Sequence, residues 1–150
     1  MLERRKARHQ ALRILYQREI TGESVSDIID GGSYLPDDEE EDPTEGGPSE
    51  FARRVSSGVE AHQERIDEVI GSISENWTVH RMPPVDRSIL RIAVWEMLYA
   101  EDIPSSVSIN EAVEMAKVYG GDDSSKFVNG ILGRLAEEPG TASKEAVMDD

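Results

Sequence analysis

Residues 85–102 read VDRSILRIAVWEMLYAED, and this stretch decides the fold. It follows the pair Pro83-Pro84, which marks the start of a new element. Apolar side chains recur almost all around the helix that it would form, a pattern typical of a helix buried on every side. The sequence therefore predicts a central core helix over residues 86–101.

The polar members of this helix need an explanation because charge is costly in a core. Glu96 falls between isoleucines in projection and should need a partner. Arg87 and Arg91 lie one turn apart on one side of the helix. They either neutralise neighbouring acids, which the buried position favours, or bind a nucleic acid.

On the N-terminal side, apolar residues at helical spacing predict a helix from about residue 4 to 20, ended by Gly22. A short amphipathic segment at 25–30 follows. A long helix then runs from an N-cap at Ser49 to about residue 74, with Gly58 as a point of kinking or close packing. The apolar face of the first helix, from which its basic side chains lie largely apart, comprises Ala7, Ala11, Leu12, Ile14, Leu15 and Ile20.

On the C-terminal side, Ser108 and Glu111 form a capping-box pattern at the start of a helix that ends at Gly120-Gly121. Residues 122–124 then begin a last helix, which ends before Pro139. Two glycines inside that helix, Gly130 and Gly133, predict close contact with a neighbouring helix.

No stretch of the chain has the alternating pattern of a strand, so the predicted fold is all-α, with about six or seven helices in a single domain of 150 residues. Seven acids occupy the nine positions 37–45 among glycines and prolines. Residues 31–48 are therefore predicted to be a disordered acidic loop, since they bury too little apolar surface to offset chain ordering. Residues 139–150 are predicted to be a flexible tail.

Charge is distributed unevenly along the chain, whose net charge is −15. Six basic residues, against Glu3 alone, fall within positions 1–18: Arg4, Arg5, Lys6, Arg8, Arg13 and Arg18. Such a distribution indicates an end that binds an anion, nucleic acid being the commonest. A solvated helix face is the alternative.

Several classes of function find no support in the composition. The chain has no cysteine and three histidines at no metal-ligand spacing, and it lacks a phosphate loop or a serine-hydrolase motif. We therefore expect no catalytic activity, no cofactor and no metal site. The absence of a long apolar run predicts a cytoplasmic protein without a membrane span.

Three stretches carry a resemblance: VDRSILRIAVWEML, INEAVEMAKVYG and DDSSKFVNGILG, with the basic opening RRKARHQALRILYQ. Together they resemble the NusB family of bacterial transcription antitermination factors, whereas residues 31–48 have no counterpart there. The resemblance implies two helical subdomains and a protein that binds boxA-type single-stranded RNA with ribosomal protein NusE. That assembly belongs to the transcription elongation complex and supports ribosomal RNA operons. Whether the free protein forms a homodimer stays open.

The resemblance also implies particular site residues. Asp86 falls where the family contacts NusE. The implied RNA surface comprises Arg4, Arg5, Lys6, Arg8, Tyr119, Asp123, Lys126 and Phe127.

Ordinary roles compete with these assignments. The two aromatic residues could pack in the core, Asp123 could be a helix N-cap, and Asp86 suits the first turn of a helix. The rival hypothesis for the whole chain is a helical adaptor whose basic N-terminal helix binds an acidic protein.

Overall fold

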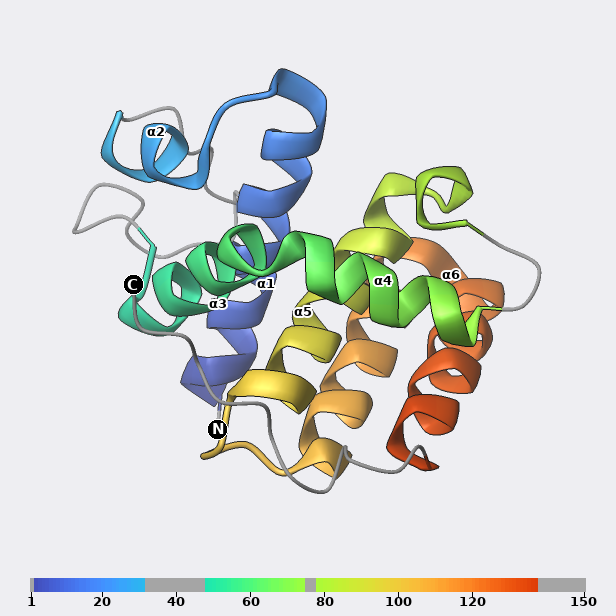
Figure 1. The fold of residues 1–150 in the computed structure, drawn as a ribbon. Helices are drawn as coiled ribbons and strands as arrows, with labels where there is room; N and C mark the ends of the chain where they lie inside the picture. The colour runs from blue at the N-terminus through green and yellow to red at the C-terminus, as the bar shows by residue number, and fades with distance from the viewer. Residues whose placement is uncertain (1, 32–47, 75–77, 138–150) are drawn as a thin grey trace. The chain divides into compact units, whose positions relative to one another are not determined.

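The computed structural model describes residues 2–31, 48–74 and 78–137, and within these ranges every regular element is helical (Figure 1). The predicted all-α class is confirmed. The elements are α1 (Leu2–Thr21), α2 (Val25–Asp30), α3 (Glu50–Ala61), α4 (Gln63–Ile73), the short 3-10 helix η1 (Val79–Arg81), α5 (Pro84–Tyr99) and α6 (Ser105–Glu137). None of the helices in the described part of the chain combines the length and apolar character needed to span a bilayer. The predicted acidic loop falls almost wholly, and the predicted tail wholly, outside the described residues.

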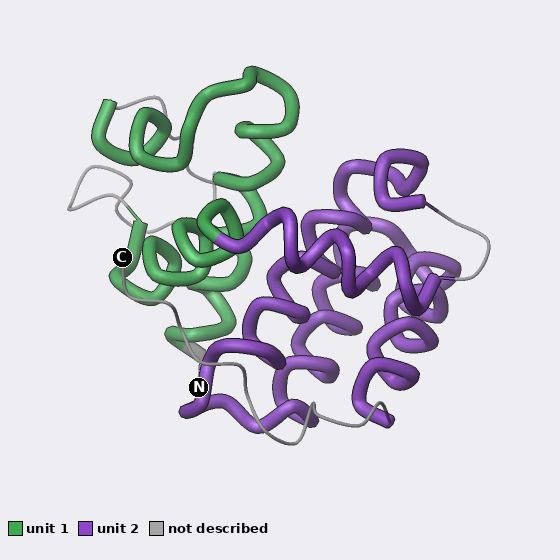
Figure 2. Tube along the Cα trace, viewed as in Figure 1, with its two compact units in different colours: residues 1–61 green, residues 62–150 purple. Residues whose placement is uncertain are grey.

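The chain divides into two compact units, residues 1–61 and residues 62–150 (Figure 2). The first unit contains α1, α2 and α3, and the second contains α4, η1, α5 and α6. The prediction of two helical subdomains is thus confirmed.

In the first unit, α1 packs mainly against α3 and also against α2. The Glu60 carboxylate of α3 joins the three helices, since its Oε2 accepts hydrogen bonds from Arg18 Nε at 2.9 Å and from the Val25 N–H at 3.0 Å. As predicted, α1 ends before Gly22, whose φ of 79° suits a residue without a Cβ. Ile20 was expected on the apolar face but is 63% exposed, because it lies in the last turn, beyond the buried part of the helix.

The predicted helix over residues 49–74 is two helices. Its N-cap is confirmed, because Ser49 Oγ accepts a hydrogen bond from the Ala52 N–H at 3.1 Å. The break falls at His62, with φ −115° and ψ 17°, and not at Gly58, which lies inside α3. Apolar spacing continues past the break, so periodicity could not reveal one residue that leaves the helical conformation.

In the second unit, α5 packs against α6 and α4, and every residue from Ser88 to Tyr99 is buried. The two charged residues within this buried stretch bind neighbouring helices. Arg91 donates to both carboxylate oxygens of Asp67 on α4, at 2.8 and 2.9 Å. Ser108 Oγ on α6 donates to Glu96 at 2.8 Å. The predicted core helix, its need for a partner at Glu96 and the neutralising role of Arg91 are confirmed.

Helix α6 differs from the prediction at its start. It begins at Ser105, so Ser108 lies inside the helix and bonds Glu96 instead of capping the backbone. The predicted capping box is therefore wrong. The interruption at Gly120-Gly121 is confirmed, because Gly121 has φ 84° and ψ −169° between two helical halves.

Two glycines near the end of α6 were expected to mark close helix packing, and this prediction is wrong. A Cβ built on Gly130 or Gly133 would meet nothing within 4 Å. Both lie away from the buried side of the helix, which is formed by Val128, Ile131 and Leu132.

Candidate nucleic-acid interface

The basic residues near the N-terminus lie on the first turns of α1. Arg4, Arg5 and Lys6 are exposed, as phosphate ligands must be. Arg8 is 3% exposed, so the prediction that it lies off the buried face is wrong. The first two turns of α1 therefore present three cations to solvent and turn a fourth inward.

The aromatic ring of Phe51 explains how an arginine is accommodated there. Arg8 Cζ lies over this ring, 5.3 Å from its centroid, and Arg4 Cζ lies over it at 4.6 Å. A third guanidinium, that of Arg54 on α3, is 5.9 Å from the same centroid. A cation over an aromatic face is attracted by the negative potential of the ring.

Sequence reasoning missed the part that α3 plays in this basic end. Phe51 follows the helical apolar spacing of α3, yet this residue is only half-buried. The adjoining pair Arg53-Arg54 was the signal that could have indicated it, since two consecutive arginines lie on different sides of a helix.

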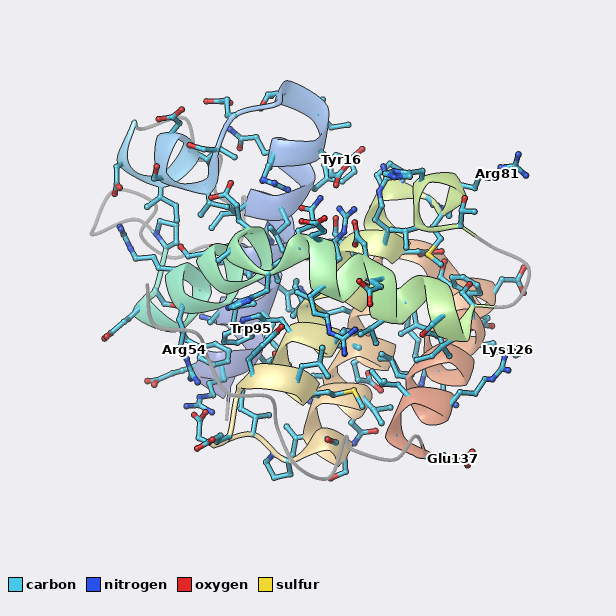
Figure 3. The ribbon with its side chains drawn as sticks, viewed as in Figure 1. Tyr16, Arg54, Arg81, Trp95, Lys126 and Glu137 are labelled. Carbon is cyan, nitrogen blue, oxygen red and sulfur yellow. The ribbon has the colours of Figure 1, made fainter. Side chains whose placement is uncertain are left out.

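In the second unit, the predicted RNA-contacting residues of α6 flank its interruption at Gly121. Tyr119 is 38% exposed, Lys126 is exposed and Phe127 is half-buried. Figure 3 shows Lys126 projecting away from α6. Neither aromatic residue is fully buried, so neither is an ordinary core residue.

The geometry of the turn at Gly121 bears on the alternative role of Asp123 as a helix N-cap. Asp123 lies in the helical part that follows the turn, and its side chain is exposed. Among the described residues, the side-chain hydrogen bond at this turn runs from Ser125 Oγ to the carbonyl of Asp122, at 2.9 Å. Asp123 is therefore not seen as an N-cap.

Asp86 lies in the first turn of α5, as predicted, but its side chain is only 6% exposed. Its carboxylate is close to the interruption in α6, because a Cβ built on Gly120 would lie 3.3 Å from Asp86 Oδ1. The same Cβ would lie 2.3 Å from Ser124 Oγ. Glycine at position 120 thus leaves room for the Ser124 side chain, next to the Asp86 carboxylate.

There are consequently two candidate surfaces, one in each unit. The first holds the exposed cations of α1 beside Phe51 and Arg54, and the second holds the residues around Gly121 together with Asp86. Within the described residues, no group of three or more histidine or acidic side chains is placed to hold a metal ion.

Comparison with known proteins assigns this arrangement to a family. Residues 5–137 match the NusB family. The transcription antitermination protein NusB of Kineococcus radiotolerans is 44% identical over 143 residues, which cover 95% of this chain and 99% of that protein.

Solved structures give the same result. The structure of T. maritima NusB has a TM-score of 0.75 and 37% identity, covering 90% of this chain and 91% of that chain. A crystal structure of antitermination factors NusB and NusE in complex with dsRNA shares the fold, with a TM-score of 0.69, 24% identity and coverage of 90% and 96%. The chain belongs to the NusB family.

Proposed function

We propose that this chain is a transcription antitermination factor that binds boxA-type RNA together with ribosomal protein NusE and so supports transcription of ribosomal RNA operons. The observation that carries the proposal is the family match over residues 5–137. The role is one of binding within a transcription elongation complex in the cytoplasm, and it requires no catalytic group.

The two candidate surfaces, one in each unit, supply the two kinds of group that hold single-stranded RNA. Phosphates are neutralised by cations, and unstacked bases lie on aromatic rings. We assign the first role to Arg4, Arg5 and Lys6 and the second to Tyr119 and Phe127. Lys126 adds a cation beside the rings, and the exposed Asp123 carboxylate can accept a hydrogen bond from a base amino group. Arg8 is buried beside these cations of α1, over the ring of Phe51, and adds its positive charge to theirs.

The partner surface is proposed at the start of α5. Antitermination factors NusB and NusE have been crystallised in complex with dsRNA. The sequence resemblance implies a NusE contact at Asp86. Because Asp86 is only 6% exposed, little of its side chain can reach a partner, and its carboxylate lies near Gly120. The proposed contact therefore includes the backbone around Asp86.

Titration of a boxA-type RNA oligonucleotide, with and without NusE, tests the function. We expect submicromolar binding that NusE tightens, and RNA should raise the affinity for NusE by the same factor, because coupling between two ligands is reciprocal. The variant Asp86→Asn should reduce this factor, whereas Glu101→Gln, an exposed acid beyond the other end of α5, should leave it unchanged. Absence of RNA binding at low salt, with or without NusE, would favour the adaptor hypothesis.

A further inference from the structure

Three guanidinium groups from two helices share one aromatic ring in the first unit. Arg4 and Arg8 come from α1, and Arg54 comes from α3, with Cζ-to-centroid distances of 4.6, 5.3 and 5.9 Å from Phe51. Arg8 is buried, whereas Arg4 and Arg54 are exposed. The ring thus holds one inner cation and two outer cations.

The neighbouring arginine, Arg53, has a different environment. Its Nε donates to the carbonyl of Pro48 at 3.2 Å, and its Nη1 lies 3.4 Å from Asp30 Oδ1 in a salt bridge. Arg53 therefore stabilises the local structure that precedes α3. Arg54, one residue later, lies over the same ring as Arg4 at the basic end of α1.

A guanidinium over a ring is suited to binding phosphate. The group is planar, and its N–H donors point outward in its own plane while one face lies over the aromatic carbons. The ring restricts the long side chain without cancelling its charge. Such preorganisation lowers the ordering cost that would otherwise be incurred when the ligand binds.

We propose that Arg4 and Arg54, held by Phe51, form a preorganised site for backbone phosphate of RNA, in which Arg54 is a phosphate ligand and Phe51 is a positioning residue. The inference rests on the proposed RNA-binding function and extends its surface from α1 to α3. Two cations drawn to one ring raise the positive potential locally on a chain whose net charge is −15.

The first arm of the test compares Arg54→Gln with Arg53→Gln, which removes the same charge one residue away. Binding of a boxA-type single-stranded RNA oligonucleotide is measured over a series of salt concentrations. Each phosphate contact on single-stranded nucleic acid contributes about 0.7 to the slope of log affinity against log salt. Arg54→Gln should lower the slope by about 0.7, which corresponds to roughly fivefold weaker binding at 0.1 M salt relative to the 1 M limit. Arg53→Gln should leave the slope unchanged.

The second arm removes the ring while keeping every charge. Phe51→Leu retains apolar volume but cannot hold a guanidinium over a π face, so RNA binding should weaken roughly threefold or more, the cost of ordering long side chains on binding. Phe51→Trp should restore affinity, because indole binds cations at least as well as phenyl does. A merely structural Phe51 would give no such rescue, and thermal melting of each variant checks that the fold is intact.

Several outcomes would overturn the inference. If the wild type binds RNA but Arg54→Gln keeps the full salt slope, or if the two arginine variants behave alike, the RNA-binding function stands and the proposed site does not. If Phe51→Leu and Phe51→Trp bind equally well, Phe51 is not a positioning residue. If the wild type fails to bind RNA at low salt, both the function and the site are refuted.

Discussion

Helices α1 and α5 both carry arginines, but they differ in burial. Helix α1 is buried on one face only, whereas α5 is buried on every side from Ser88 to Tyr99. On α5, Arg91 is held by two hydrogen bonds to Asp67, and Glu96 accepts one from Ser108. On α1, three cations at successive positions are exposed, whereas Arg8 is buried and Arg18 is paired with Glu60. The comparison shows which helix can use its charges for stability and which can use them for binding. A fully buried helix needs a partner for every charge, whereas a half-buried helix can keep charges for a ligand.

The largest difference in stability should come from truncating an apolar side chain on each helix. Leu90 on α5 is fully buried, and Leu90→Ala should lower the free energy of unfolding by about 2–5 kcal/mol, through lost burial and the cavity left behind. Tyr16→Ala on α1 should cost less, about 1–2 kcal/mol, since this residue is 40% exposed and loses less buried area. Urea denaturation measures both values, and equal losses would contradict the comparison.

A smaller effect is expected from removing one acid of an ion pair. Asp67→Ala leaves the Arg91 guanidinium, whose side chain is 4% exposed, without its carboxylate, and should cost about 3 kcal/mol. Glu68→Ala, next in sequence, breaks an exposed pair with Arg65 and should cost no more than about 0.5 kcal/mol. Thermal melting of the two variants side by side decides the point, and comparable shifts would mean that the buried pair is dispensable.

The smallest effect on stability should come from the exposed cations of α1. Arg5→Gln combined with Lys6→Gln should change the free energy of unfolding by less than about 0.5 kcal/mol, as is usual for surface substitutions. The same variant should lower the salt slope of RNA binding by about 1.4, since two phosphate contacts are lost. A retained slope in filter binding would show that these side chains do not contact phosphate.

Features that depend on neighbours in the sequence could be predicted. Glycine readily adopts a positive φ and so predicts the end of a helix. Both Gly22 and Gly121 have positive φ in the structure, at the two interruptions that the sequence predicted. Ser49 caps α3 through the N–H three residues later, as a local motif should. The need of Glu96 for a partner followed from the apolar pattern around it.

Features that depend on tertiary contacts could not be predicted from the sequence. The partner of Glu96 is Ser108, whose spacing to Glu111 indicated a capping box instead. Arg8 is buried because Phe51, far along the chain, offers its ring, and no periodicity contains that contact. Residues around the α6 turn were predicted as one site from resemblance, whereas the approach of Asp86 to Gly120 is visible only in three dimensions.

The short connection between α5 and α6 affects the order in which contacts can form during folding. Only residues 100–104 separate these helices, so they can pack as a hairpin at a small cost in loop-closure entropy. Packing of α1 on α3 requires the chain to close over residues 22–49, a much longer span. Contacts of short sequence separation are typical of rapid folding. The core helix thus has a packing partner close to it in sequence, whereas α1 meets the ring of Phe51 only after a longer span of chain has closed.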